Sequence, residues 1–399
     1  MLLVRLLDEL AVFLPAGTLE SFRADLGLTY AQAGAVLAAI APGAMIGAVF
    51  AAAADRYSRR VIAAGGAFGF AAALALFAAG AGFPVLAAAA FGMGMASTAM
   101  VDAAEVALVD LAGDDLRRYL ARGNLLATIG DLLGPALIAG VALTGLSWRG
   151  VFATGAGLMG LYGAVLAVTP LPPPLAVADG DGDGEGDLDG HGVGAVIRDP
   201  AVWALGLLGL AMGPFDETLI GFVIALLEHD RGVSPAVASA VAFTGLGGGL
   251  LSFTILARRL EDVDDGRVLL LAVWAMTAGA VAMVVCPVLP VVAAAAFAES
   301  VGLNLGWLAV QHRSLTLRPG HVGRTKAVLS VIEFSGFWIP IGIGAVADRA
   351  GLRTALGAFV VLGLVMVALA SGDQRRAATR GRPPSPGSIG RRSSADCPP

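Results

Sequence analysis

The chain has 399 residues, of which 57% are hydrophobic and 14% are charged, with a formal net charge of −5. Soluble domains carry about 25% charged residues, so this composition excludes a soluble globular protein and indicates a membrane protein. The net charge says little here, because charges in such a chain lie in loops and their sidedness matters more than their sum. The two cysteines, Cys286 and Cys397, argue against a disulfide framework.

A window of about 20 residues predicts twelve apolar segments that are long enough to cross a bilayer as helices. Alanine and glycine dominate them, which suits close packing between helices in lipid. The predicted fold class is therefore an all-α membrane protein with twelve transmembrane helices and no strands. The segments cover residues 2–22, 29–53, 61–82, 84–108, 123–145, 150–170, 201–227, 235–257, 268–288, 290–311, 326–347 and 352–371.

The basic residues predict the orientation of these segments. With the N-terminus in the cytoplasm, the cytoplasmic side receives 21 of the 26 Lys and Arg residues. Such an asymmetry is the positive-inside signal, and an even number of spans puts both termini in the cytoplasm. The five basic residues expected outside are Arg23, Arg149, Arg231, Arg349 and Arg353.

A segment of different composition separates the sixth and seventh spans. It reads LPPPLAVADGDGDGEGDLDGHGVG, and its proline, glycine and acidic residues without apolar periodicity predict a flexible linker. We therefore expect a six-helix half over residues 1–170, a cytoplasmic acidic linker over 171–200, a second six-helix half over 201–372 and a disordered basic tail over 373–399.

The two halves resemble each other in sequence. LLDELAVFLPAG at 6–17 recurs as PFDETLIGFVIA at 214–225, each with an Asp-Glu pair in the first apolar segment of its half. PVLAAAAFGMG at 84–94 likewise recurs as PVVAAAAFAES at 290–300. Internal duplication in a membrane protein is typical of secondary transporters, which bind substrate near the middle of the bilayer between the repeats.

A compact charged cluster follows the second span, and this part of the chain resembles the major facilitator superfamily. That family carries Gly-x-x-x-Asp-Arg-x-x-Arg-Arg/Lys between helices two and three. Asp55, Arg56, Arg59 and Arg60 match it, with Ala51 in place of the glycine. The resemblance implies a latch that holds the cytoplasmic side closed. The alternative is that these charges only set the topology.

The fifth span carries a second, partial resemblance to the drug–proton antiporters of this superfamily. Gly130, Gly134 and Pro135 match their Gly-x-x-x-Gly-Pro stretch, but Ile138 and Ala139 stand where a glycine pair is expected. Gly-x-x-x-Gly lets a neighbouring helix approach closely, and the proline bends the span. A purely structural bend is the alternative.

The acidic residues inside the spans are the candidates for chemistry. A carboxylate at the centre of the bilayer costs about 2.5–3.5 kcal/mol, so it requires a cavity, a partner or a proton. Asp102 and Glu105 share one face of the fourth span, which has no basic residue, and each hinders ionisation of the other, as a proton carrier requires. The alternative for an acid near a helix end is solvation at the headgroups. The residues predicted for proton coupling or for the substrate cavity are Asp102, Glu105, Asp131, Asp8, Asp216 and Glu217.

We therefore expect a secondary active transporter that works by alternating access in a plasma membrane, with proton-coupled efflux of amphipathic or cationic compounds as its function. An acid-lined cavity without buried Lys or Arg favours such substrates over anions. The alternatives are proton-coupled uptake of a small metabolite and a non-transporting receptor on the same scaffold. Its expected partners are a small molecule, protons and the lipid bilayer, without nucleic acid, and a monomer is expected. No catalytic, metal or cofactor site is expected, since the four histidines lack metal-ligand spacing.

The charge distribution gives a first prediction. A reporter fused after Arg60 or at Gly186 should be cytoplasmic, whereas one fused at Arg149 or Arg231 should be external. Alkaline phosphatase and green fluorescent protein fusions would read the two sides. A cytoplasmic signal at Arg231 would contradict the arrangement in two six-helix halves.

Overall fold

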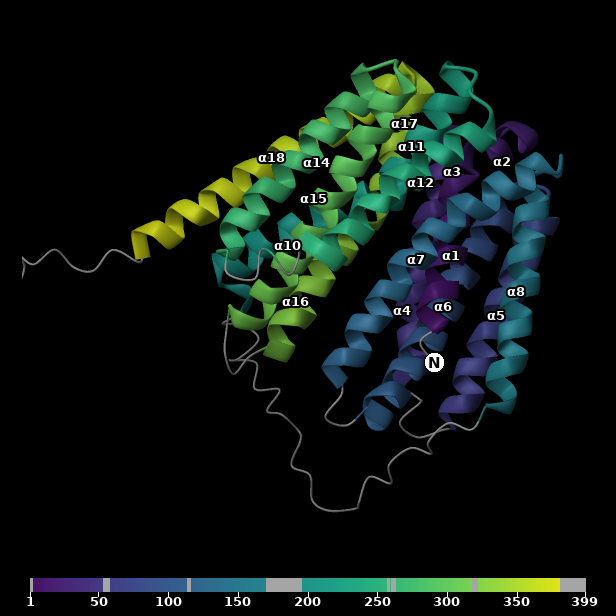
Figure 1. Ribbon diagram of the computed structural model, residues 1–399, viewed down its shortest axis with the longest axis horizontal. Helices are drawn as coiled ribbons and strands as arrows, with labels where there is room; N and C mark the ends of the chain where they lie inside the picture. The colour runs from purple at the N-terminus through teal and green to yellow at the C-terminus, as the bar shows by residue number, and fades with distance from the viewer. Residues whose placement is uncertain are drawn as a thin grey trace, which may run out of the picture.

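The computed structural model describes residues 3–52, 58–112, 116–169, 196–256, 259, 263–317 and 322–380, and these residues form helices without any strand. Figure 1 shows the helices grouped in two halves, and the first half contains α1–α8. The helices of the first half are α1 (Leu3–Gly17), α2 (Leu19–Leu26), α3 (Tyr30–Ala38), α4 (Ile40–Ala52), α5 (Arg59–Ala79), α6 (Phe83–Ala112), α7 (Leu116–Leu143) and α8 (Trp148–Val168).

The second half begins at α10 and has more interruptions. Two of its short elements, η3 and η6, are 3-10 turns, and two others, η4 and η5, are π-helical turns. Its elements are α10 (Pro200–Met212), η3 (Gly213–Phe215), α11 (Glu217–Ala225), η4 (Leu226–Asp230), α12 (Pro235–Leu251), η5 (Ser252–Leu256), α14 (Asp265–Val285), α15 (Leu289–Thr316), α16 (Val322–Phe334), η6 (Ser335–Trp338), α17 (Ile339–Ala350) and α18 (Leu352–Arg380).

Eleven helices of the described residues are long and apolar enough to cross a membrane, and α1 with α2 supplies the twelfth segment that the sequence predicts. The first segment contains Pro15, which lacks the N–H for one bond of the helical ladder, and three residues later it is divided into α1 and α2 at Thr18. Thr18 then stabilises the break, since its hydroxyl donates a 2.7 Å hydrogen bond to the carbonyl of Leu14. The predicted twelve-helix fold is confirmed, and the first span is one of several that are interrupted.

The two halves contain equivalent contacts, as expected of an internal repeat. Arg149, at the start of α8, donates hydrogen bonds of 2.8 and 2.7 Å to the carbonyls of Ala78 and Gly80 at the end of α5. Arg353, at the start of α18, donates hydrogen bonds to the carbonyls of Val284 and Val285 at the end of α14. In each half an arginine thus satisfies carbonyls that a helix end leaves without partners.

Small residues allow the helices to approach closely, as the sequence predicts. A Cβ atom added at Gly43 of α4 would collide with the carbonyl oxygen of Phe91 in α6, and one added at Gly94 of α6 would collide with that of Ile40. In the second half, a Cβ atom at Gly248 of α12 would collide with the carbonyl oxygen of Phe297 in α15. Backbone contacts of this kind replace the bulky core packing of soluble proteins.

The halves meet along a seam between α3 and α17, and we call the end of the bundle at which Tyr30 begins α3 the Tyr30 end. Figure 1 shows the halves converging there, whereas the starts of α7 and α16 lie apart at the opposite end. The Asp348 carboxylate at the end of α17 accepts hydrogen bonds of 2.7 Å from the N–H of Tyr30 and 2.9 Å from that of Ala31. Asp348 therefore caps a helix of the other half, where a negative charge is favourable.

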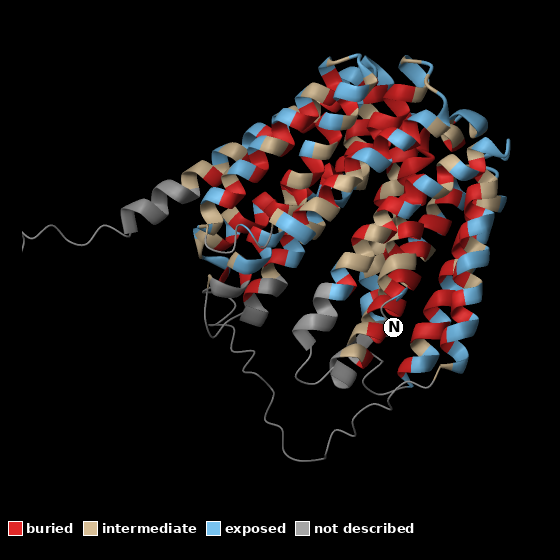
Figure 2. Ribbon diagram, viewed as in Figure 1, coloured by how far each residue is buried: buried red, intermediate tan, exposed pale blue. Residues whose placement is uncertain are grey.

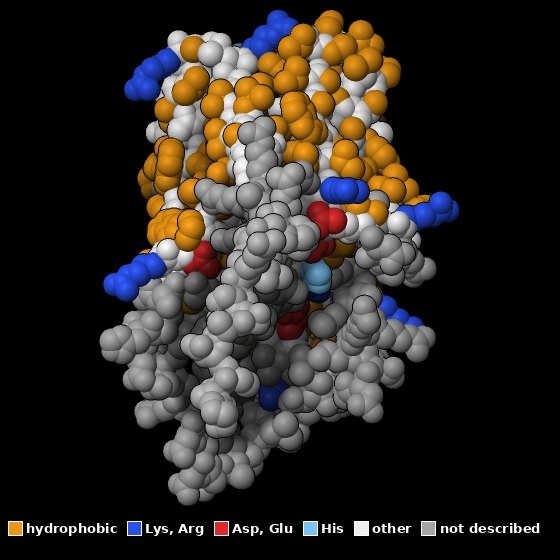
Figure 3. All heavy atoms as spheres, turned by 90° about the vertical axis from the view of Figure 1, so that its left-hand side faces the viewer, with side chains coloured by type: hydrophobic (Ala, Val, Ile, Leu, Met, Phe, Trp, Pro, Cys, Tyr) orange, Lys and Arg blue, Asp and Glu red, His pale blue; other side chains and the backbone are white. Residues whose placement is uncertain are grey.

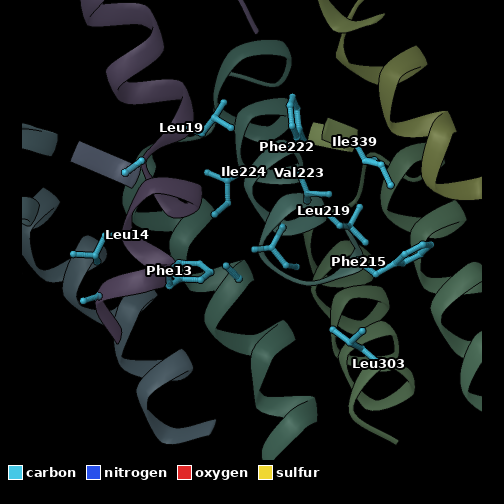
Figure 4. Close-up of a cluster of buried hydrophobic side chains, with 14 of the residues drawn as sticks. Phe13, Leu14, Leu19, Phe215, Leu219, Phe222, Val223, Ile224, Leu303 and Ile339 are labelled. Carbon is cyan, nitrogen blue, oxygen red and sulfur yellow. The ribbon is translucent and has the colours of Figure 1, made fainter. Parts of the chain in front are cut away.

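A buried apolar cluster joins the halves below this seam. α1 contacts α11, and Figure 4 shows Phe13 of α1 on the side of that helix toward α11, whereas Leu14 points away from it. Every residue of α11 from 219 to 225 is buried, so this helix lies inside the bundle rather than against lipid. Phe215, just before α11, stacks edge to face with Phe359 of α18 at 5.3 Å between ring centroids.

The outer surface is apolar where a bilayer would contact it. Figure 2 shows the buried residues along the inner faces of the helices and the exposed residues on their outer faces and at their ends. In Figure 3, hydrophobic side chains cover a broad belt of one face, and Lys and Arg side chains lie mostly near its edges. A belt of this kind is what a spanning bundle presents to lipid.

The last helix is longer than predicted. α18 continues to Arg380, so the first residues of the segment expected to be a disordered tail are helical. Gln374, Arg375, Arg376 and Ala377 are good helix formers, and the next glycine and proline occur only at Gly381 and Pro383. Residues 381–399 lie outside the described residues, as do 171–195 of the predicted linker.

The seam gives a second prediction. Asp348→Asn removes the charge that caps α3, so the state closed at the Tyr30 end should lose stability relative to the state open there. A cysteine at Leu37, in a background lacking Cys286 and Cys397, should react faster with a membrane-impermeant thiol reagent added from that side.

Asp25→Asn is the matched control, because Asp25 lies at the same end but accepts its hydrogen bonds from Trp148 and Arg149 of its own half. Equal labelling rates in wild type and Asp348→Asn would show that the cap does not hold the seam closed.

Candidate functional site

The carboxylates predicted from the sequence converge at the centre of the bundle. Asp131 of α7 interacts electrostatically with Glu9 of α1 and with Asp216 and Glu217 at the start of α11. Asp8 in turn interacts with Asp102 and Glu105 of α6. The structure thus brings all six predicted residues, Asp8, Asp102, Glu105, Asp131, Asp216 and Glu217, into one region between the halves.

Two of these carboxylates in the first half have partners. The buried Asp8 accepts a 2.6 Å hydrogen bond from the hydroxyl of Ser97. Glu105 forms an ion pair with Arg5 of α1. The sequence predicts no basic residue in the fourth span, and it gives no sign that Arg5 of another helix pairs with Glu105. α6 has no basic residue of its own, but the neighbouring helix supplies one, and only tertiary packing reveals it.

An interrupted helix presents two adjacent acids in different directions. α10 ends at Met212, and the 3-10 turn of Gly213, Pro214 and Phe215 precedes α11. Pro214 lacks an N–H, and Asp216 leaves the helical conformation with φ −74° and ψ −127°. As a result Glu217 lines a larger cavity and Asp216 a smaller one.

The larger cavity has a volume of about 250 Å³ and lies between α1, α3, α4, the α10–α11 break and the α16–α17 break. Its walls are mostly apolar, with Leu210, Phe334 and Phe337 among the lining side chains, and its acids are Glu217 and Glu333. Concave apolar pockets with a few convergent polar groups are the usual form of small-molecule sites.

The smaller cavity has a volume of about 60 Å³ and lies between α7, α11, α12 and α15. It is more polar, and its acids are Asp131, Asp216 and Glu299. Glu299 is 1% exposed, and its Oε1 atom has no hydrogen-bond partner. The prediction of site residues did not include Glu299, because its sequence context AAAAFAES gives no sign of a cavity.

The two cavities share an electrostatic character. None of the described residues that line them is Lys, Arg or His. Within the described part of the chain, no group of three or more His, Cys, Asp or Glu residues is arranged to hold a metal ion. The arrangement suits a proton or an organic cation, and it disfavours an anion.

The glycines of the fifth-span motif lie against α1. A Cβ atom at Gly130 would collide with the carbonyl oxygen of Leu6 and lie 3.1 Å from the Cβ of Glu9. One at Gly134 would lie 2.8 Å from Cδ1 of Phe13. The close approach expected of Gly-x-x-x-Gly is present, and it places Asp131 of α7 near the acids of α1. The antiporter role of the motif stays a prediction.

The predicted cytoplasmic latch is only partly described. Asp55 and Arg56 lie outside the described residues. Arg59 is buried at the start of α5, and Arg60 beside it is exposed. The latch therefore stays a prediction.

Sequence reasoning missed the residues that close the Tyr30 end. Glu20 of α2 is buried, binds Arg23 at 2.7 Å, accepts a hydrogen bond from the hydroxyl of Tyr30, and lies 3.3 Å from His229 of the other half. Asp348, in contrast, lies in a recognisable sequence pattern. Gly344, Asp348 and Arg349 repeat the Gly-x-x-x-Asp-Arg spacing of the cluster around Asp55, but between the last two helices.

A family model described as Major Facilitator Superfamily matches residues 1–336. The chain belongs to the major facilitator superfamily. It is thus a multi-pass membrane protein of a transporter family. A comparison with curated protein sequences found no significant match.

Three solved structures with the same fold are distant from this chain in sequence. The nucleoside transporter NupG, in a mutant form, is 13% identical with a TM-score of 0.76 over 92% of this chain and 98% of that one. A bacterial homologue of the human lysosomal transporter Spinster, inward-facing and occupied, is 17% identical with a TM-score of 0.71 over 96% and 97%. A D-xylose–proton symporter is 17% identical with a TM-score of 0.68 over 93% and 95%. Identities this low support the superfamily fold and do not assign a substrate.

The contact between α1 and α7 gives a third prediction. Gly130→Val should lower the unfolding temperature of the detergent-solubilised protein, because overpacking costs about 1–3 kcal/mol. Gly140→Val in the same helix is the control, since a Cβ atom there meets nothing within 4 Å. If both variants unfold at the same temperature, the close approach does not contribute to stability.

Proposed function

We propose that this superfamily member is a proton-coupled exporter of small amphipathic or cationic compounds in a plasma membrane, with both termini in the cytoplasm. The observation that carries the proposal is the larger cavity. There Glu217 and Glu333 lie in a wall that includes Phe334 and Phe337, and no described lining residue is basic. An apolar body with a positive charge would bury its apolar surface against the wall and place its charge beside the carboxylates.

The coupling to protons is proposed from the acids around this cavity. Six carboxylates, Asp8, Glu9, Asp102, Asp131, Asp216 and Glu217, interact electrostatically, and the basic side chain that acts on them is Arg5, which pairs with Glu105. Close carboxylates that outnumber the available cations cannot all ionise cheaply inside a membrane protein. Some of them therefore bind protons that a cationic substrate or water can displace.

Closure of the bundle at the Tyr30 end indicates, in this proposal, the side of the membrane from which the larger cavity is reached. By the positive-inside distribution, the Tyr30 end is external, and the seam of Asp348 with α3 closes it. The larger cavity would then be reached from the cytoplasm, which is the state in which an exporter loads its substrate. In the opposite state, we propose that Asp55 and the arginines Arg56, Arg59 and Arg60 close the cytoplasmic side.

Uptake of a metabolite is the second candidate. The solved structures with this fold include, by their names, a nucleoside transporter and a D-xylose–proton symporter. The apolar and aromatic wall of the larger cavity favours an amphipathic compound over a sugar, whose hydroxyl groups require many hydrogen-bonding side chains.

The proposal is tested by transport in proteoliposomes that hold the purified protein. With the compartment facing the cytoplasmic side loaded with ethidium or tetraphenylphosphonium, a pH gradient that is acidic on the external side should drive the probe outward against its concentration. Collapsing the gradient with nigericin should stop this accumulation. Movement only in the opposite direction would favour uptake, and no movement of a broad compound panel would favour a receptor.

The larger cavity gives a fourth prediction. Glu333→Gln keeps the size of the side chain and removes its charge, so a charge-assisted contact worth about 1.5–3 kcal/mol is lost. The affinity for tetraphenylphosphonium should fall by about tenfold or more, as measured by equilibrium binding to the solubilised protein.

Glu228→Gln serves as the control, since Glu228 is a half-buried acid in η4 that does not line either cavity. If Glu333→Gln and Glu228→Gln bind the cation as tightly as the wild type, Glu333 does not contact the cation.

A further inference from the structure

We propose that Glu299 of α15 holds the exchanged proton in the smaller cavity, apart from the substrate, which occupies the larger one. The proposal rests on the proposed function as far as the substrate is concerned. The position of the proton itself follows from the surroundings of one side chain. These surroundings differ from those of the acids in the first half.

Glu299 is enclosed more completely than the other acids. Its side chain is 1% exposed, and the Oε1 atom has no hydrogen-bond partner. Gly279 of α14 packs directly on its stem, since a Cβ atom there would lie 2.7 Å from the Cβ of Glu299. An ionised carboxylate in such a place loses its hydration without gaining a donor at Oε1, which disfavours the charged form. The protonated acid is not disfavoured in this way.

The groups that face Glu299 also favour the protonated acid. α7 contributes Asp131, and the start of α11 contributes Asp216, so both titratable neighbours that line the cavity are acids. α12 and α14 contribute the glycines Gly249 and Gly279. In its own helix, one of the two N–H groups of the Asn304 amide is donated to the carbonyl of Ser300 at 2.9 Å. None of the described residues lining the cavity offers a positive charge.

Two acids of the first half, in contrast, have partners. Glu105 pairs with Arg5, and its side chain is 38% exposed. Asp8 accepts a hydrogen bond from Ser97. Each of these two carboxylates thus has a donor or a cation beside it. Glu299 has neither at its Oε1 atom, so a proton is the one partner the site can take.

The break between η3 and α11 connects the proton to the substrate. Asp216 lines the cavity of Glu299, and the next residue, Glu217, lines the larger cavity. A cation beside Glu217 stabilises negative charge on the neighbouring carboxylates and so promotes loss of the proton.

Glu299 then passes its proton to water on the open side and becomes a carboxylate. It is reprotonated from water when the other side opens, which restores the acid and disfavours the bound cation. One proton leaves for each cation bound. Because the proton and the cation each disfavour binding of the other, the two are transported in opposite directions, which is antiport.

The decisive experiment needs no substrate. Infrared difference spectroscopy of the reconstituted full-length protein should show, at neutral pH, the C=O stretching band of a protonated carboxylic acid that disappears at alkaline pH. Glu299→Gln should lose the component of this band that Glu299 contributes, and Glu299→Asp should retain that component at a shifted frequency. Absence of the band in the wild type, or an identical band in the wild type and in Glu299→Gln, would overturn the proposal. If Glu299→Gln does not insert, the frequency shift in Glu299→Asp still decides it.

Transport then separates this proposal from the proposed function. Glu299→Gln should lose accumulation of tetraphenylphosphonium driven by a pH gradient, while its binding and its exchange between equal concentrations are retained. Glu299→Asp should restore the coupled flux. If Asp102→Asn loses coupling and Glu299→Gln keeps it, the proton lies on the first-half acids and the proposal is wrong. A wild type that shows the Glu299 band but moves no cation supports the proton site and contradicts cation export.

Discussion

A carboxylate inside a membrane protein must have a cation, hydrogen-bond donors, water or a proton, and the centre of this bundle depends on how that requirement is met at each position. The first half meets it with Arg5 and Ser97. The second half leaves Glu299 without a donor at one oxygen. Carboxylates of the two halves therefore have different surroundings, and the difference lies in the neighbouring helices rather than in the acids themselves.

Interrupted helices make this distribution of acids possible. An uninterrupted helix would place Asp216 and Glu217 about 100° apart on one continuous surface. The turn at Gly213, Pro214 and Phe215 instead separates them into two cavities while keeping them adjacent in the chain. A comparable break at Pro15 and Thr18 divides the first span. Broken spans of this kind are found where transporters bind their ligands, because irregular backbone is tolerated only where it lines a cavity or is buried in protein.

Sequence alone predicts the fold class because hydrophobicity and length determine where a chain can cross a bilayer. It also predicts which acids lie in the spans, since charged residues stand out in apolar segments. It does not predict which acid has a partner. Arg5 and Glu105 are 100 residues apart, and nothing local indicates that α1 and α6 bring them together. Glu299 could be recognised as buried within a span, but its missing partner and its cavity depend on α7, α11 and α14.

The repeat also bears on how the two ends could alternate. Asp348 lies at the end of α17 and caps the start of α3, so one acid of the second half closes the Tyr30 end through backbone N–H groups of the first. Asp55 follows α4 with the same Asp-Arg spacing, at the opposite end of the span that begins with α3. A carboxylate on the first turn of a helix is worth about 0.5–2 kcal/mol, which is enough to bias a closure and too little to make it permanent. The latch that we propose at Asp55, were it of similar strength, would keep both states populated, so that a proton on one carboxylate and a cation beside another could decide between them.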